Sequence, residues 1–123
     1  LACDYHPVNI IWAKDSINAV IDWEFCGMKP ALYDLANMLG CLGMEDPNAL
    51  LGPLAVDLVA RLRDQNYLDV LSWRLLLDYM IALRFAWLSE WLRYRDAKMV
   101  ELEFTYMKLL IENKPLLLKA WSL

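Results

Sequence analysis

The chain has 123 residues, 59% of them hydrophobic, and a formal net charge of −4 with no basic run or stripe. This length can bury one sizeable core, and the acidic balance argues against nucleic acid as a partner. The most apolar stretch, 73–92, is long enough to span a bilayer, but it contains Arg74, Asp78, Arg84 and Glu90. Such charges cost roughly 2.5–3.5 kcal/mol each at the centre of a spanning helix, so we expect no membrane segment.

The first part of the chain predicts a β-hairpin whose open end gathers oxygen-bearing side chains. Residues 9–21 are typical of two strands joined by a polar turn. Because the two open ends of a hairpin lie side by side, we expect Asn9 and Asp22 to be neighbours, with Asp4 a few residues upstream. Two carboxylates and an amide oxygen, without a Cys/His cluster, suit a hard cation such as Mg²⁺.

The order of these residues also matches the catalytic half of phosphoryl transfer. In that template an Asp accepts the proton of the substrate hydroxyl, an Asn after four intervening residues binds metal, and a later Asp binds metal. Asp4, Asn9 and Asp22 meet this order. Each alone is a common turn or cap residue, but the three together, with a hairpin between them, favour the catalytic interpretation.

Residues 2–39 resemble the aminoglycoside phosphotransferase and choline kinase family. The resemblance lies in Asp4-Tyr5-His6-Pro7-Val8-Asn9, Ile21-Asp22-Trp23-Glu24 and Tyr33-Asp34-Leu35-Ala36, in that order. It implies a mainly α fold with one small β-hairpin, the C-terminal lobe of a protein-kinase-like α+β fold. It also implies an ATP-dependent kinase that transfers the γ-phosphate to a hydroxyl of a small metabolite or antibiotic. Asp4 would be the catalytic base, and Asn9 and Asp22 would hold Mg²⁺.

The resemblance implies further roles around this site. His6, the sole histidine, and Glu24, near the metal, are secondary candidates, with His6 at a mainly structural position. Asp34 is expected to brace the catalytic loop, because a buried carboxylate needs donors and loop N–H groups supply them. The family's usual His-Gly before the catalytic Asp is Ala2-Cys3 here, a departure that concerns the rigidity of the loop more than the chemistry.

Only three residues precede Asp4, so no Gly-rich loop and no strand lysine can stand before it in this chain. By resemblance, the N-terminal lobe that grips ATP is missing, and we expect the chain to be a fragment of a longer enzyme. It would form a single truncated domain, with the catalytic loop, hairpin and first helix in residues 1–43 and a helical subdomain in 44–123. Alone it should bind nucleotide weakly, catalyse nothing and expose an apolar patch where that lobe would lie.

The cysteines indicate the compartment. Cys3, Cys26 and Cys41 form no C-x-x-C pair, and with one histidine they make no zinc site. We expect free thiols, which point to a reducing compartment and most simply to the cytoplasm.

Helical periodicity begins after the hairpin. It predicts a buried helix over 31–39 or somewhat beyond, after which Gly40 and Gly43 loosen the chain. Asp46 is predicted to be the N-cap of a new element, which the Gly-Pro pair at 52–53 interrupts before a helix with one apolar face.

Two long helices are expected to follow. Ser72 would cap one over 73–94, whose narrow polar stripe predicts that most of its circumference is covered. Asp96 would cap the other, over 97–113, before a final apolar turn that docks back. The inward-facing residues of this second helix are expected to be Val100, Phe104, Met107 and Ile111.

Six tryptophans suggest an aromatic cage for a quaternary amine, but aromatic residues at helical spacing are more often core. We therefore interpret Trp73, Trp87 and Trp91 as packing residues of one helix. Trp23 follows Asp22 directly, and we interpret it as a residue that packs and aims that carboxylate.

In the family that the chain resembles, the acceptor lies between the catalytic loop and the C-terminal helices. Asp78 and Glu90 are the candidate substrate-binding residues, because they stand on an otherwise apolar helix where an unpaired charge is costly. Carboxylates there would favour a hydroxyl acceptor that carries an amine. Pairing with Arg74 or Arg84 would instead make both carboxylates structural.

Two other classes of function stay open. One is a non-catalytic kinase-like protein that binds a ligand or partner. The other is a helical interaction module with an incidental hairpin, which would require Asp4, Asn9 and Asp22 to diverge in space.

Overall fold

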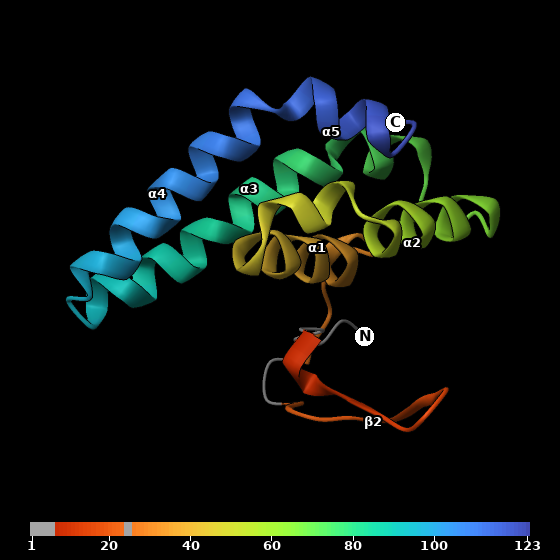
Figure 1. Ribbon diagram of the computed structural model, residues 1–123, viewed down its shortest axis with the longest axis horizontal. Helices are drawn as coiled ribbons and strands as arrows, with labels where there is room; N and C mark the ends of the chain where they lie inside the picture. Colours follow the sequence, from red (N-terminus) through yellow and green to blue (C-terminus); the bar gives the residue numbers. More distant parts are fainter. Residues whose placement is uncertain (1–6, 24–25) are drawn as a thin grey trace.

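The computed structural model describes residues 7–23 and 26–123, and this part of the chain is mainly helical with one small hairpin (Figure 1). The expected composition of the fold is thereby confirmed for the described residues. None of the helices among them is long and apolar enough to cross a bilayer. In chain order the elements are the 3-10 helix η1 (Pro7–Asn9), β1 (Ile10–Trp12), β2 (Ile17–Val20), α1 (Tyr33–Glu45), the 3-10 helix η2 (Pro47–Leu51), α2 (Pro53–Asp64), α3 (Val70–Arg93), α4 (Ala97–Glu112) and α5 (Lys114–Ala120).

The hairpin projects from the helical body and is joined to it at its open end (Figure 1). Its strands are antiparallel, with Ile10 opposite Val20, and the register is irregular next to Trp12. The element η1 contacts α1, and Asn9 and Ile10 are buried, whereas the side chains nearer the turn are exposed. The hairpin is therefore anchored at the end that carries the candidate metal ligands.

The core lies where α1, α3 and η2 meet, with α4 and α5 packed on the outside (Figure 1). The helix α3 packs on both α1 and α4, and its Leu76, Leu77 and Met80 are fully buried. The final segment docks back as expected, because Trp121 is buried and its indole Nε1–H donates to the carbonyl oxygen of Leu50 at 2.8 Å. One helical core thus extends from α1 to the end of the chain.

Two glycines that were expected to loosen the chain lie inside α1 instead. A Cβ at Gly43 would overlap the Tyr106 hydroxyl and lie 2.6 Å from Leu50 Cδ1. The same hydroxyl donates to the carbonyl oxygen of Gly40 at 2.8 Å, which ties α4 to α1. The lack of a side chain at Gly43 is therefore required for this close approach.

The helix starts follow the capping rules, with one correction. Asp46 and Asp96 are confirmed as N-caps, since each carboxylate accepts a backbone N–H two or three residues later. Ser72 is not a cap: α3 begins at Val70, and the cap is Asp69, which accepts the N–H of Ser72 at 2.6 Å. This hydrogen bond lowers the pKa of the Asp69 carboxyl.

The inward face of α4 differs from the expected one. Of the four residues expected to face inward only Met107 is buried, and Phe104 and Ile111 are 56% and 58% exposed. The helix turns its polar Glu103 and Tyr106 into the core instead, which apolar periodicity cannot register. The helix α3 is likewise less covered than expected, because Phe85 is also largely exposed.

A matched pair of variants tests the close packing at α1. Gly43→Ala should lower the free energy of unfolding by roughly 1–3 kcal/mol, because the new methyl group overlaps Tyr106 and Leu50. Gly40→Ala is the control, since its Cβ would meet only Arg84 Cδ at 4.0 Å. It should be neutral or stabilise the helix by up to about 1 kcal/mol. Urea denaturation measures both, and equal effects would contradict the packing described.

Candidate functional site

The open end of the hairpin brings Asn9 and Asp22 together. Beyond the last paired residues of the ladder, the N–H of Ile21 donates to the carbonyl oxygen of Asn9 at 2.9 Å. Asp22 is the next residue, so it leaves the hairpin beside Asn9. The backbone positions that carry the amide of Asn9 and the carboxylate of Asp22 are thereby neighbours at one end of the hairpin.

Local hydrogen bonds hold Asp22 from both sides. The N–H of Ile21 is bound to Asn9, and the indole Nε1–H of Trp23 donates to the carbonyl oxygen of Val20 at 2.8 Å. Asp22 itself is exposed and has a φ of 63°, in the left-handed region that non-glycine residues rarely adopt. This conformation costs roughly 1 kcal/mol. It recurs at functional sites, but also after helices, where Asn66 and Arg95 adopt it here.

Three of the candidate residues, Asp4, His6 and Glu24, lie outside the described residues. Within residues 7–23 and 26–123, no group of three or more His, Cys, Asp or Glu residues could hold a metal ion. A site built on Asn9 and Asp22 would therefore take its remaining ligands from water, from phosphate oxygens or from the rest of the hairpin end. This donor set fits Mg²⁺, which takes oxygen ligands and keeps several waters.

Asp34 lies in the first turn of α1, half-buried beside Leu35 and Met38 of α1 and Leu58 of α2. A carboxylate is favourable at this end of a helix, because the first-turn N–H groups carry partial positive charge. Its role as a brace stays a prediction, since residues 1–6, which include Asp4 of the catalytic loop, lie outside the described residues.

Both carboxylates proposed for the acceptor pocket are paired. Asp78 accepts from Lys114 at the start of α5, and Glu90 accepts from Arg93 one turn along α3. The hydrogen bond that Arg93 donates to Glu90 raises the pKa of the Arg93 guanidinium. The expected pairing is therefore present, although the partners are Lys114 and Arg93 instead of Arg74 and Arg84, and the substrate-binding role of both residues stays a prediction.

Sequence analysis missed a buried ion pair between α3 and α4. Arg84 Nε donates to Glu103 Oε2 at 3.0 Å, and Arg84 Nη2 donates to Oε1 of the same carboxylate. The Trp91 Nε1–H also donates to Oε1, at 3.2 Å, and Glu103 is fully buried. The guanidinium lies 5.9 Å from the ring centroid of Trp87. An arginine in the middle of an apolar helix was the available signal, because a buried charge requires a partner.

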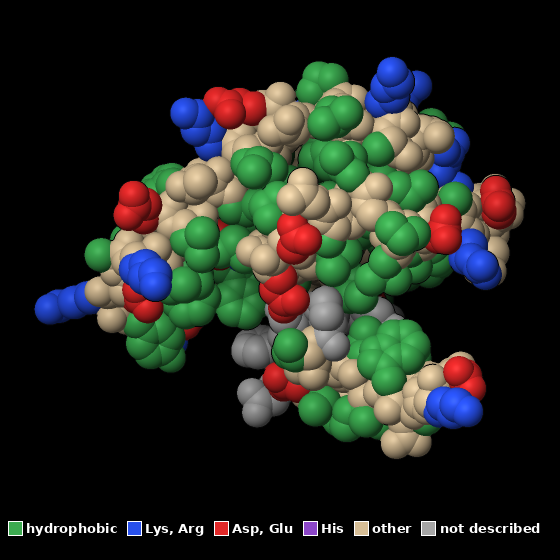
Figure 2. Space-filling view, viewed as in Figure 1, with side chains coloured by type: hydrophobic (Ala, Val, Ile, Leu, Met, Phe, Trp, Pro, Cys, Tyr) green, Lys and Arg blue, Asp and Glu red, His purple; other side chains and the backbone are tan. Residues whose placement is uncertain are grey.

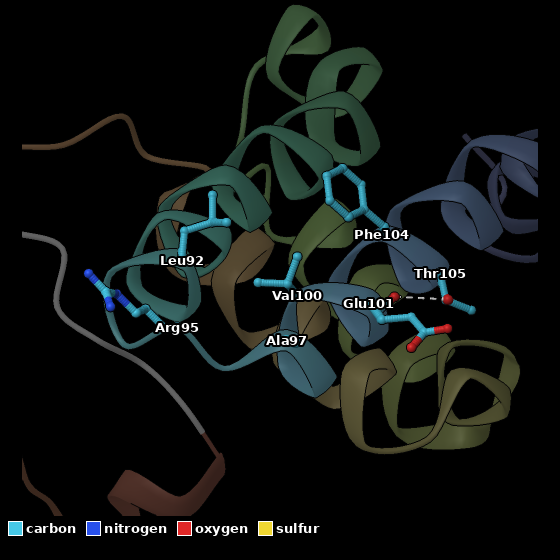
Figure 3. A pocket seen from close by; sticks show the side chains of 7 residues that line it. All are labelled: Leu92, Arg95, Ala97, Val100, Glu101, Phe104 and Thr105. Carbon is cyan, nitrogen blue, oxygen red and sulfur yellow. Dashed lines mark hydrogen bonds between the residues drawn. The ribbon is translucent and has the colours of Figure 1, made fainter.

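Two cavities large enough for a small molecule flank α3. One, of about 600 Å³, lies between α1 and α3; we call it the α1–α3 groove. The other, of about 610 Å³, lies where α3 meets α4, and Figure 3 shows Phe104 and Val100 directed into it. The polar and aromatic side chains that line the α1–α3 groove are Tyr33, Asn37, Trp87, Ser89, Glu90 and Arg93. Trp87 is half-buried: one side of its ring packs against the protein, and the other lines the α1–α3 groove. The sequence did not reveal this second role.

The cysteines also require a correction. Cys41 is free and buried, as expected, but Cys26 is disulfide-bonded. Spacing showed no close pair, and a bridge between distant positions leaves no local pattern. The inference of a reducing compartment therefore loses part of its support.

Removing one member of the buried ion pair should be costly. Glu103→Leu leaves Arg84 buried without its carboxylate, so the free energy of unfolding should fall by about 3–5 kcal/mol. The double variant Arg84→Met with Glu103→Leu should recover most of this loss. Lys108→Gln, which removes the exposed pair of Lys108 with Glu112 at 3.7 Å, is the control and should cost less than about 1 kcal/mol. A double variant no more stable than Glu103→Leu would refute this account.

The backbone at Asp22 gives a second test. Asp22→Gly should protect the Ile21 amide from hydrogen exchange better than Asp22→Ala, by about 0.5–1 kcal/mol, because glycine adopts positive φ without strain. At Asp15, an exposed turn residue outside the left-handed region, glycine should be no better than alanine. The same ranking at both positions would mean that Asp22 is not strained.

Comparison with known proteins adds the family. Residues 3–71, which include Asp4, Asn9, Asp22 and Asp34, match the profile of a phosphotransferase enzyme family (APH). The comparisons with curated proteins and with solved structures gave no match. The matched segment covers more than half of the chain, from before the hairpin to the start of α3, and confirms the resemblance found in the sequence. The chain therefore belongs to the phosphotransferase enzyme family.

Proposed function

We propose that the chain is the catalytic part of an ATP-dependent kinase that phosphorylates a hydroxyl of a small molecule. Asp4 would be the catalytic base, and Asn9 and Asp22 would hold Mg²⁺. The observation that carries this proposal is the convergence of Asn9 and Asp22 at the open end of the hairpin. Family membership supports a phosphotransferase, and the order of the three residues matches the phosphoryl-transfer template.

The reaction assigns a task to each of these residues. The acceptor oxygen forms a bond to the γ-phosphorus, and the bond from that phosphorus to the β–γ bridging oxygen breaks, so that ADP leaves with the electron pair. Asp4 takes the hydroxyl proton. The hydrogen bonds on either side of Asp22 hold its backbone next to that of Asn9, which supports a shared metal site for the two side chains. Bound Mg²⁺ would neutralise charge on the phosphate oxygens.

The surface of the hairpin supports a covering lobe. Trp12 and Trp23 are 65% and 60% exposed, and Ile11, Ile17 and Ile21 are exposed with them. Figure 2 shows hydrophobic side chains gathered on the hairpin, with charged ones at its tip. A two-stranded hairpin is marginally stable by itself, and an exposed apolar patch marks an interaction site. We infer that the nucleotide-gripping lobe of the same protein covers it, and that the enzyme works in the cytoplasm, which supplies ATP.

Metal binding by the described residues can be tested on the chain itself. Mn²⁺, a paramagnetic substitute for Mg²⁺, should broaden the NMR signals of Ile21 and Trp23, and Asp22→Asn should weaken this binding at least tenfold, or about 1.4 kcal/mol. Asp15→Asn is the matched control, because it removes a carboxylate at the opposite end of the same hairpin. If both variants weaken Mn²⁺ binding equally, the metal site is wrongly assigned.

Turnover then separates a kinase from a non-catalytic binding protein. In the protein joined to its nucleotide-binding lobe, Asp22→Ala should remove nearly all phosphoryl transfer, and Asp4→Asn should reduce kcat far more than ATP affinity. Absence of phosphoryl transfer to any small alcohol, with metal and nucleotide bound, would leave only the binding function.

A further inference from the structure

We propose that the α1–α3 groove is the acceptor site and that it takes a neutral polyhydroxylated molecule, a sugar or a polyol. The proposal rests on the proposed function, because one hydroxyl of the bound molecule would receive the phosphoryl group. The cavity of about 600 Å³ falls in the range of small-molecule sites, and its lining combines aromatic faces with a few polar groups.

The aromatic wall of the groove is fixed from behind. Trp87 stacks on Trp91 with ring centroids 6.1 Å apart, and the indole N–H of Trp91 donates to the buried carboxylate of Glu103. The Arg84 guanidinium, paired with the same carboxylate, packs against Trp87. Because the pair is buried and bidentate, the face that Trp87 presents to the groove is set before any ligand binds. A fixed aromatic face suits the apolar C–H face of a sugar ring.

The polar groups of the groove suit hydroxyls. Asn37 is only 5% exposed and places an amide in the lining, with its Oδ1 accepting from the Cys41 thiol at 3.9 Å. An amide both donates and accepts hydrogen bonds. Ser89, Glu90 and Arg93 add a hydroxyl, a carboxylate and a guanidinium from α3. A ligand hydroxyl donates one hydrogen bond and accepts others, so a set with donors and acceptors mixed can satisfy several hydroxyls at once.

The charges of the groove argue against an amine. The Glu90 carboxylate is already bound to Arg93, so no described residue of the lining offers an unpaired carboxylate to an ammonium group. The Lys29 ammonium lies 3.8 Å from the ring centroid of Tyr33, so a cation already occupies a face of that ring. An amine-bearing ligand would therefore find one carboxylate in the lining, already paired with Arg93, whereas a neutral polyol requires no charged partner.

The groove and the hairpin share α1. Tyr33 and Asn37 of the groove stand in the first two turns of this helix, and η1, which ends at Asn9, contacts the same helix. One rigid helix therefore relates the acceptor groove to the proposed metal ligands.

The test is binding of a matched pair of sugars to the whole chain, without nucleotide or metal. D-glucose and D-glucosamine differ by a hydroxyl against an ammonium group, and myo-inositol serves as a second neutral probe. We expect the two neutral probes to shift the indole N–H signal of Trp87 in NMR titrations, with glucosamine binding at least threefold more weakly. Trp87→Leu should weaken glucose binding at least tenfold, and Arg93→Gln several-fold.

Phe104→Leu is the control, because it alters the other cavity beside α3 (Figure 3). It should leave glucose binding unchanged, and circular dichroism should confirm the helical content of each variant. If Trp87→Leu does not fold, the exposed Arg93→Gln decides the question by itself. Tighter binding of glucosamine than of glucose would overturn the substrate class. If no sugar binds, or if Phe104→Leu weakens glucose binding as much as the groove variants do, the groove is not the acceptor site. Since no step here uses ATP, sugar binding without turnover would refute the kinase proposal alone.

Discussion

The buried pair of Arg84 and Glu103 is the interaction on which the helical part depends. It joins the middle of α3 to the middle of α4. Among the described residues, every buried side-chain nitrogen and oxygen atom has a hydrogen-bond partner. Removing two charges from water costs several kcal/mol per ion, and their attraction offsets this only with good geometry and further hydrogen bonds. Trp91 supplies such a bond. The pair therefore contributes alignment more than net stability: it fixes which faces of α3 and α4 meet, and hence where the neighbouring rings lie.

This alignment reaches α1 through Tyr106. Its ring lies 5.5 Å from the Arg84 guanidinium, and its hydroxyl donates to Gly40 while occupying the space that a side chain at Gly43 would fill. Burial raises the pKa of this hydroxyl, so it stays protonated and remains a donor. Three helices are thus held in register by polar contacts inside an apolar core. The hairpin is ordered differently, by local hydrogen bonds around Asp22 and by the contact of η1 with α1.

Features that depend on residues close together in the sequence were predicted correctly. Predictions failed where the structure depends on contacts between residues far apart in the sequence. The hairpin and the caps at Asp46 and Asp96 follow from turn and capping chemistry within a few residues, and the structure has them. Glu103 carries no such local signal: it resembles a solvated charge until Arg84 is seen across from it, and so the buried face of α4 was assigned to the wrong residues. Gly43 was misjudged for the same reason, because the partner that requires it is Tyr106, on another helix. The roles of the catalytic-loop residues remain predictions.

The prediction of the substrate class also depended on contacts that the sequence does not reveal. Counting carboxylates on an apolar helix suggests an amine-binding pocket, because each unpaired charge would require a cation. The structure supplies those cations from within the chain, as Lys114 for Asp78 and Arg93 for Glu90. A paired carboxylate still accepts a hydrogen bond from a hydroxyl, and its charge no longer calls for a cation on the ligand. The neutral ligand that we propose for the α1–α3 groove rests on these partners, which lie on other turns or helices and which the carboxylates alone do not reveal.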